Sequence, residues 1–228
     1  MIGQPIMTSM LRAALVAAAS ACGIGAVQAG QPSATEIANQ VQARYDRVRD
    51  FSADFTQEAV SGVLRKKIVE RGSVVVKKPG KMRWTYKAPE EKVFVSDGTK
   101  MYMHTPADNQ VIVSPVTAAD QATTAVLFLS GKGNLTRDFT VSLIPGAPAG
   151  SYALKLQPKL AERDYDWLQL VVDRSTYQIQ GLTAADKQGT TSTFTFTNFK
   201  ENVGPADKTF QFTIPRGADV IEAGSPGR

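Results

Sequence analysis

The sequence predicts a mainly β fold in which helices cover one face of an antiparallel sheet. Met82, Trp84 and Tyr86 alternate with polar residues, and a period of two places these apolar side chains together on one side of a strand. Strand-like segments recur along the 228 residues, with short turns between them and no regular alternation with long helices. The longer helical patterns, near residues 33–48 and 117–130, are too few to cover both faces of such a sheet.

The first 29 residues have the composition of a secretory signal peptide. Arg12 precedes the small apolar run at residues 13–21, and Val27 and Ala29 have the small side chains that suit cleavage before Gly30. The apolar run is too short to cross a bilayer core of about 30 Å. We therefore expect residues 1–29 to be removed and residues 30–228 to form a single domain, a length that one β domain can reach.

The sole cysteine, Cys22, lies within this segment, so cleavage would leave a mature chain without a disulfide. A rival interpretation is that residues 19–22, Ala-Ser-Ala-Cys, form a processing site at which Cys22 becomes acylated. Ala19 stands where that pattern usually has leucine, which favours the soluble product. The fate of Cys22 decides between a soluble protein and a lipid-anchored one.

The first expected element of the mature chain is a helix that begins after Ser33. Ser33 and Glu36 form a capping-box pattern, in which each side chain satisfies a backbone donor of the other residue. Ile37, Val41 and Tyr45 follow at helical spacing, so one face of the helix is apolar. This face needs an apolar partner, which the sheet supplies.

The sheet begins at Phe51, because apolar and polar residues alternate from Phe51 to Thr56. Asp97 and Gly98 lie between two strand-like runs and supply the positive φ angles of a tight hairpin turn. Between residues 117 and 130 the alternation stops, and the apolar residues predict a helix that ends at Gly131. The other expected strands span residues 62–77, 81–87, 92–96, 100–104, 110–114, 139–144, 152–157, 167–172, 177–183, 191–199 and 209–214, with a short helical turn at 134–138.

The residues available for chemistry argue against an enzyme and against a metal site. His104 is the only histidine and the mature chain would lack cysteine, so the usual nitrogen and sulfur ligands of zinc are missing. No nucleophile-elbow sequence accompanies His104, and residues 131–133 lack the spacing of a phosphate loop. We therefore expect no catalytic residue, no cofactor and no metal ion.

The formal net charge of +5 makes the chain mildly basic. Cations at residues 65–67 and 77–78 and at Lys81, Arg83 and Lys87 make the outer surface locally cationic. Such a surface either steers acidic partners or anionic headgroups or is simply a solvated sheet face, and the solvated face is the favoured interpretation. Nearby acids offset these charges and no recognised nucleic-acid motif is present. Nucleic-acid binding is therefore not expected.

The order of several short motifs is the most specific feature of the sequence. These motifs are residues 51–57 (Phe-Ser-Ala-Asp-Phe-Thr-Gln), Gly72, residues 77–79 (Lys-Lys-Pro), Trp84, Pro89, residues 96–98 (Ser-Asp-Gly), Tyr102 and Pro106. In this order and at this spacing, after a short amphipathic helix, the set resembles the LolA family of periplasmic lipoprotein carriers. The resemblance is strong from about residue 37 to residue 113, weaker to residue 139, and one of pattern beyond.

The resemblance implies a strongly curved sheet that forms an incomplete β-barrel, with helices covering its concave face as a lid. It also implies a soluble, monomeric carrier in the periplasm that binds the acyl chains of lipoproteins in a hydrophobic cavity and moves them from the inner to the outer membrane. The implied partners are acylated lipoproteins, an inner-membrane transporter of the LolCDE type and, where present, an outer-membrane receptor of the LolB type. A lipid-anchored LolB-like receptor and a lipid-sensing regulator of the RseB kind are the alternatives.

The candidate lipid contacts are aromatic, methionine and leucine residues, which offer large apolar surfaces, with methionine adapting its shape. They are Phe51, Phe55, Met82, Trp84, Tyr86, Phe94, Met101, Met103, Leu127 and Phe128, with Val111 and Val113 expected beside them. Composition alone leaves open whether these residues fill a core or line a cavity, and the resemblance favours a cavity.

The resemblance also implies a latch for the lid. In LolA proteins an arginine before the proline of the 77–79 motif forms hydrogen bonds with the lid helices and closes the empty cavity. This chain has Lys78 at that position. Lysine lacks the planar fork of arginine, so we expect a weaker or differently arranged latch.

Overall fold

A computed structural model of the chain describes residues 31–116, 133–162 and 165–223. Residues from Pro32 onwards belong to one compact unit, which contains every described helix and strand. The expected signal segment, with Cys22, lies outside the described residues, and so does the expected helix at 117–130 with Leu127 and Phe128.

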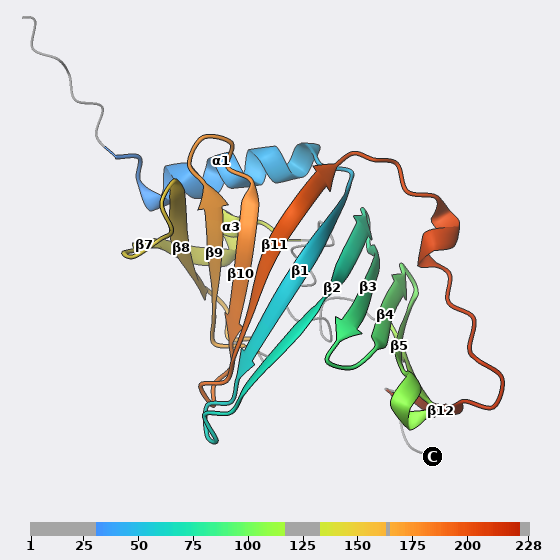
Figure 1. Cartoon of the computed structure of the whole chain (residues 1–228). Helices are drawn as coiled ribbons and strands as arrows, with labels where there is room; N and C mark the ends of the chain where they lie inside the picture. The colour runs from blue at the N-terminus through green and yellow to red at the C-terminus, as the bar shows by residue number, and fades with distance from the viewer. Residues whose placement is uncertain (1–30, 117–132, 163–164, 224–228) are drawn as a thin grey trace, which may run out of the picture. The chain divides into compact units, whose positions relative to one another are not determined.

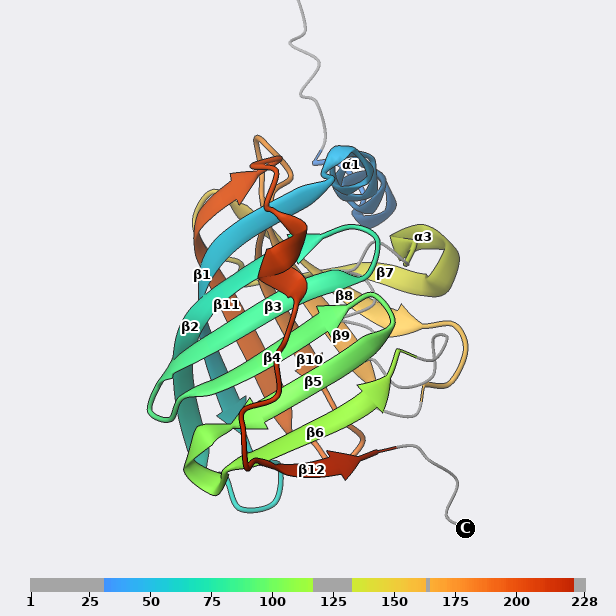
Figure 2. The same cartoon turned by 90° about the vertical axis from the view of Figure 1, so that its right-hand side faces the viewer.

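The unit is built on one 12-stranded sheet with the order β12-β6-β5-β4-β3-β2-β1-β11-β10-β9-β8-β7 (Figure 1). All neighbouring pairs are antiparallel except β12 and β6, which are parallel. The strongly curved sheet carries β2–β6 in front of β7–β10 in the view of Figure 2. Its end strands, β7 and β12, do not pair with each other, so the sheet is open, as an incomplete barrel requires.

The strands keep the expected positions with few exceptions. They are β1 (Asp50–Val60), β2 (Lys67–Lys77), β3 (Lys81–Ala88), β4 (Lys92–Asp97), β5 (Lys100–Thr105), β6 (Gln110–Pro115), β7 (Phe139–Ile144), β8 (Ser151–Pro158), β9 (Trp167–Asp173), β10 (Ile179–Ala185), β11 (Thr191–Glu201) and β12 (Asp219–Glu222). The described helices are α1 (Ala34–Arg47), α3 (Leu135–Asp138) and the short 3-10 helices η1 (Pro106–Asp108) and η2 (Asp207–Phe210).

Helix α1 begins with the capping box that the sequence predicts. The Glu36 amide donates to Ser33 Oγ at 3.2 Å, and the Ser33 amide donates to the Glu36 carboxylate at 2.8 Å. The Ser33 amide and the Ser33 hydroxyl both donate to the Glu36 carboxylate, which holds the pKa of Glu36 below its usual value. The apolar face of the helix is buried in the main core through Ile37, Val41 and Tyr45, as its spacing predicts.

The strand register gathers large apolar side chains on one side of the sheet, which we call the inner face. Phe51 lies opposite Val76, which lies opposite Met82 on the next strand. The neighbouring row pairs Val74 with Trp84. The same core extends over β8–β10 through the buried residues Leu154, Leu156, Leu168, Leu170 and Leu182.

Gly72 makes room for the aromatic packing on this face. A Cβ atom at residue 72 would lie 2.1 Å from the carbonyl oxygen of Thr85 and 2.9 Å from Phe55 Cζ. Without that atom, the ring of Phe55 packs against Trp84 and Tyr86 at centroid distances of 5.1 and 4.9 Å. The glycine in the sequence motif therefore has a packing role.

The expectation of a strand at residues 209–214 is wrong, because this segment forms no ladder with the sheet. Its alternation has another cause. Phe210 is buried, and the ring of Phe212 lies 5.4 Å from that of Tyr102 and 5.8 Å from that of His104. Residues 205–214 thus form a C-terminal strap that lies across the sheet on the side opposite β7–β10, as Figure 2 shows.

Lysine and arginine side chains hold the strap on the sheet. From the sequence, these cations are expected on a solvated surface. Lys77 Nζ lies 2.7 Å and Lys81 Nζ 3.2 Å from the carboxylate of Asp207. Hydrogen bonds from both lysines hold the pKa of Asp207 below its usual value. Arg83 donates to the carbonyl of Thr209 at 3.4 Å. This polar side of the sheet is the outer face.

Val111 and Val113 also belong to the outer face, so their expected place beside the lipid contacts is wrong. They lie opposite His104 and Tyr102, whose rings face Phe212 of the strap. A side-chain period of two places Ile112, and not its neighbours, on the inner face.

Two strand boundaries also differ from the expectation. Residues 62–66 form the turn of the β1–β2 hairpin, in which Arg65 has a φ of 54°, so β2 begins at Lys67. Strand β10 begins at Ile179 because Tyr177, with a φ of 57°, is in the left-handed region that strands do not use.

We predict that Gly72→Ala lowers the free energy of unfolding by about 1–3 kcal/mol, because the added methyl group meets the backbone of β3. Urea unfolding measures this change. Ser73→Ala, at the next position of β2 with its side chain on the outer face, is the matched control. Equal stability of the two variants would contradict the packing role of Gly72.

Candidate functional site

An aromatic cluster occupies the centre of the inner face. The ring of Phe55 lies between those of Trp84 and Tyr86, and Phe194 on β11 lies 6.0 Å from Phe55 and 5.3 Å from Trp84. Edge-to-face and tilted pairs at these distances are favourable beyond the burial of their area. Phe51, at one end of the cluster, stacks on Phe199 at 4.8 Å.

The sequence pattern does not predict that β11 contributes to this cluster. Phe194, Phe196 and Phe199 all belong to β11, which pairs with β1 and places Phe196 opposite Phe55. The signal was present in the alternation Thr-Phe-Thr-Phe at residues 193–196. That pattern predicts the strand. It does not predict that β11 pairs with β1, because the two strands are far apart in the sequence.

A row of paired residues runs from this cluster towards an exposed region of the inner face. Trp84 lies opposite Phe94, Phe94 opposite Met103, and Met103 opposite Ile112. Trp84 is 5% exposed, Phe94 and Ile112 are half-buried, and Met103 is 41% exposed. Met101, also half-buried, belongs to the same face of β5. The inner face therefore changes from a filled core to an accessible apolar surface.

The candidate lipid contacts accordingly fall into two groups. Phe51, Phe55, Met82 and Trp84 are buried in the core. Tyr86, Phe94, Met101 and Met103 are half-buried or exposed on the same face. Leu127 and Phe128 lie outside the described residues.

Tyr86 gives the apolar cluster a polar border. Its hydroxyl donates to Gln57 Oε1 at 2.9 Å, and the Gln57 amide donates to Ser192 Oγ at 2.9 Å. Burial raises the pKa of Tyr86 above its usual value, and the charge of Glu70 adds to the rise. The ammonium of Lys92 lies 4.5 Å from the centre of the Tyr86 ring.

Lys78, the expected latch, contacts the last turn of α1. Its ammonium donates to the backbone carbonyl of Tyr45 and lies 3.4 Å from the centre of the Tyr45 ring. That carbonyl also accepts the Val48 amide at the C-terminal cap of the helix. A cation at this end is favoured by the helix dipole. Burial lowers the pKa of Lys78 to about 8, against the opposing influence of Asp46 and Glu201.

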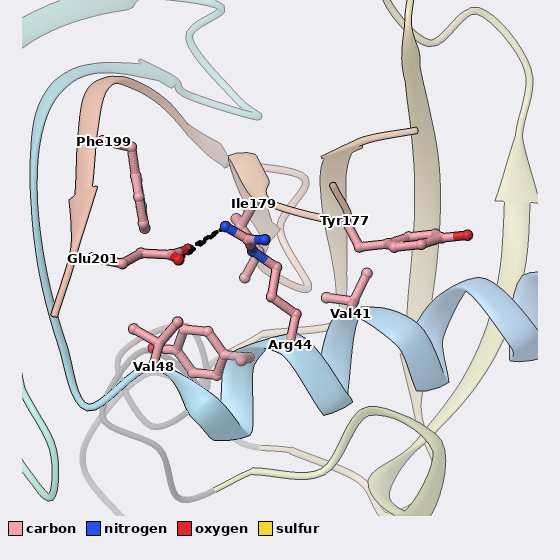
Figure 3. A pocket seen from close by; sticks show the side chains of 8 residues that line it. Val41, Arg44, Val48, Tyr177, Ile179, Phe199 and Glu201 are labelled. Carbon is pink, nitrogen blue, oxygen red and sulfur yellow. Dashed lines mark hydrogen bonds and ion pairs between the residues drawn. The ribbon is translucent and has the colours of Figure 1, made fainter. Parts of the chain in front are cut away.

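A second contact holds the same turn of α1 from β11, as Figure 3 shows. Arg44 makes two hydrogen bonds with the carboxylate of Glu201, at 2.8 and 2.9 Å, and a third with the carbonyl of Thr176 at 3.1 Å. The ion pair crosses a small pocket whose lining includes Tyr177 and Ile179. The end of α1 is therefore held both by the β2–β3 turn, through Lys78, and by the β9–β11 region.

The other candidate chemistries have no assembled site in the described part of the chain. His104 lies on the outer face against Phe212 of the strap. Within residues 31–116, 133–162 and 165–223 no group of three or more His, Cys, Asp or Glu residues is arranged to hold a metal ion. In the same residues no helix is long and apolar enough to cross a membrane.

Comparison with known families matches residues 46–213 to the family described as "Outer membrane lipoprotein carrier protein LolA". The match includes the aromatic cluster, Lys78 and most of the strap. The chain belongs to the LolA family. It therefore has the lipoprotein carrier function of that family and is not an enzyme.

Curated relatives agree with this assignment. An outer-membrane lipoprotein carrier protein of Chromohalobacter salexigens is 31% identical over 187 residues, which cover 82% of this chain and 87% of the relative. One of Methylibium petroleiphilum is 35% identical over 175 residues, covering 76% and 83% of the two chains. An uncharacterized conserved protein of Thermus thermophilus shares the fold, with a TM-score of 0.52, 13% identity and coverage of 83% of this chain and 99% of that one.

We predict that Lys78 makes stability depend on pH at mildly alkaline values. Its pKa is about 8 in the folded chain against 10.5 for an ordinary lysine, so between these values the unfolded chain binds more protons. The free energy of unfolding should therefore rise with pH from about 8 towards 10.5, and the contribution should be constant below about 8.

Urea unfolding between about pH 7 and pH 9.5, below the range in which free tyrosine ionises, measures this dependence. Lys78→Met is the control, because it removes the titrating group and keeps much of its length. A difference between the two proteins that does not change with pH would contradict the prediction.

Proposed function

We propose that the acyl chains of a lipoprotein lie on the inner face, next to Phe94, Met101 and Met103. The observation that carries this proposal is the 41% exposure of Met103 in a row of apolar residues that begins in the aromatic core. An accessible apolar surface beside a filled core provides a place for apolar ligand atoms. The buried members of the candidate set, such as Trp84, then support this surface and become contacts where the cargo displaces side chains.

The energy of acyl-chain transfer explains why such a surface is needed. Each methylene exposed to water costs about 0.8 kcal/mol, so long acyl chains need a shield while they cross an aqueous compartment. Methionine side chains suit this role because they adapt to different shapes without a fixed geometry. We infer that this carrier binds by apolar contact and has no need to recognise a particular headgroup.

We further propose the cellular route of this carrier. The signal at residues 1–29 directs the chain to the periplasm, where a transporter of the LolCDE type supplies acylated lipoproteins and a receptor of the LolB type, where present, accepts them. LolA-family carriers act in the periplasm, which supports this location. Intact mass and N-terminal sequencing of the exported protein test it: a chain that begins at an acylated Cys22 would replace the soluble carrier with an anchored receptor.

Release of lipoproteins from spheroplasts tests the carrier function itself. Added mature protein should bring newly made lipoproteins into the soluble fraction as a complex with one carrier molecule. Lipoproteins that stay in the spheroplast membrane when the folded protein is added would count against the proposal.

We predict that a photoreactive phenylalanine derivative at position 103 crosslinks to lipoprotein acyl chains. The matched control is position 102, because Tyr102 is the adjacent residue on β5 and faces the strap on the outer face. Mass spectrometry of the crosslinked peptide identifies the attached acyl chain. Equal labelling from both positions, or labelling from position 102 alone, would place the lipid elsewhere.

Lys78 is proposed as the latch that holds the closed form of the empty carrier. Arginine at this position can bond more than one carbonyl in a plane, and a hydrogen bond to a charged group contributes about 1.5–3 kcal/mol. Lys78→Arg should therefore slow amide exchange at the Val48 cap and in residues 118–129, and it should reduce cargo uptake. Lys78→Leu should speed exchange at the same amides.

Hydrogen exchange followed by mass spectrometry, together with the spheroplast release assay, measures both effects. If neither variant changes exchange or lipoprotein release, Lys78 is a helix-capping residue without a role in gating.

A further inference from the structure

The turn between β1 and β2 exposes two large apolar side chains at the end of a long hairpin. Val63 is 80% exposed and Leu64 is 77% exposed, in contrast to the half-buried residues of the same hairpin nearer the core. The exposed cations Arg65, Lys66 and Lys67 follow directly. We call residues 61–66 the β1–β2 tip. Figure 1 places it at the end of these strands remote from α1.

The backbone of the tip is held in place, so the exposure of its side chains is fixed by the fold. The Arg65 amide donates to the Ser61 carbonyl at 3.0 Å, and the Leu64 amide donates to Ser61 Oγ at 3.2 Å. The Ser61 amide donates to the Lys66 carbonyl at 3.0 Å, which closes the turn. These bonds direct Val63 and Leu64 away from the sheet.

A neighbouring turn braces the tip from the side. The Gly62 amide donates to Thr190 Oγ1 at 3.3 Å, and a Cβ atom at residue 62 would lie 2.1 Å from the carbonyl oxygen of Gln188. Gly62 therefore allows the β1–β2 tip and the β10–β11 turn to approach closely. Lys187, an exposed residue of that turn, adds another cation next to the tip.

Positive charge dominates the surroundings of the two apolar side chains. Lys67 is paired with Glu58 at 2.5 Å, which neutralises one cation. Asp186, the acid of the adjacent turn, accepts the backbone amides of Gln188 and Thr190 at 2.9 and 2.8 Å. Arg65 and Lys66 on the tip, with Lys187 beside it, outnumber this one acid, so the local net charge is positive.

We propose that the β1–β2 tip docks on a membrane that carries anionic phospholipids, inserting Val63 and Leu64 below the headgroups. Basic residues beside apolar ones are the combination that holds a protein segment at an anionic lipid interface. The inference goes beyond the carrier function, because it assigns a membrane contact to a site on the hairpin turn and not to the acyl-binding face.

A lipid surface fits this tip better than a protein partner does. A specific protein interface buries about 800 Å² on each partner, which calls for a broad face, whereas the tip is a turn of six residues. A fluid bilayer can accommodate the projecting tip because its lipids rearrange around the inserted side chains, so no matching pocket is needed. Two inserted side chains give weak, reversible binding, which suits a protein that has to leave the membrane with its cargo.

A fluorescent probe tests insertion directly. The unit from Pro32 to Arg228 contains every described element, and it has no cysteine, because Cys22 precedes it. Leu64→Cys labelled with an environment-sensitive fluorophore should shift its emission to the blue on vesicles of phosphatidylglycerol and phosphatidylcholine. Leu160→Cys is the matched control, because Leu160 is 81% exposed in a different loop. Its emission should stay unchanged.

Affinity for the same vesicles provides the second measurement. The double variant Val63→Asp, Leu64→Asp should bind roughly tenfold or more weakly than the unaltered chain, as expected for losing apolar burial and adding like charge to anionic lipid. Leu160→Asp should bind as the unaltered chain does. Arg65→Glu with Lys66→Glu should weaken binding and reduce its dependence on salt. Urea unfolding confirms that each variant is folded.

The proposal is overturned if the label at position 64 shows no shift on anionic vesicles, or if the aspartate variant keeps full vesicle affinity. It is also overturned if vesicles of phosphatidylcholine alone bind equally well. A protein partner would replace the lipid if two results are found together. No form of the chain would bind vesicles, and a tip variant would fail to exchange lipoprotein with purified membrane proteins in detergent. Spheroplast release and crosslinking at position 103 test the carrier function separately.

Discussion

One face of a single sheet provides both the core of the protein and the accessible apolar surface beside it. Because side chains alternate along each strand, only every second residue is available for both tasks. Near β1, β3 and β11 those residues are large aromatics that fill the space, with Gly72 leaving room for Phe55. Towards β5 and β6 they become smaller or more flexible, and Met103 and Ile112 are left accessible. The order of side chains along one row thus sets where the core ends.

On the inner face of β4–β6, Phe94, Met101, Met103 and Ile112 are half-buried or exposed. The strap supplies support from the outer face: Val95 and Val111 are fully buried there, although their strands present accessible residues on the other side. Phe212 lies against the rings of β5, and ionic contacts to Asp207 hold the start of the strap on β2 and β3. The strap therefore packs on the outer face of the same strands whose inner side chains are accessible.

Local patterns predicted much of this architecture, whereas packing between distant segments escaped them. The alternation at Met82, Trp84 and Tyr86, and the capping box at Ser33, depend on neighbours in the sequence and were recognised. Alternation at residues 209–214 predicts a strand that the structure does not contain, because a period of two shows which side of a segment is apolar and not whether it has hydrogen-bond partners. In the candidate site, the inner-face set was recognised from its period, but Phe194 and Phe196 depend on the β1–β11 pairing. The resemblance implies that Lys78 bonds the lid helices, and no local rule predicts its contact with Tyr45 of α1.

The pairing of β1 with β11 also bears on how the chain folds. Phe51 lies opposite Glu201, so the centre of the sheet joins residues separated by most of the 228-residue chain. Contacts of such long sequence separation form slowly, because the loop between them must first be ordered. A nascent chain has no β11 to pair with β1 until its synthesis is nearly complete. The topology thus ensures that the pairing at the centre of the sheet forms only after almost the whole chain has been synthesised.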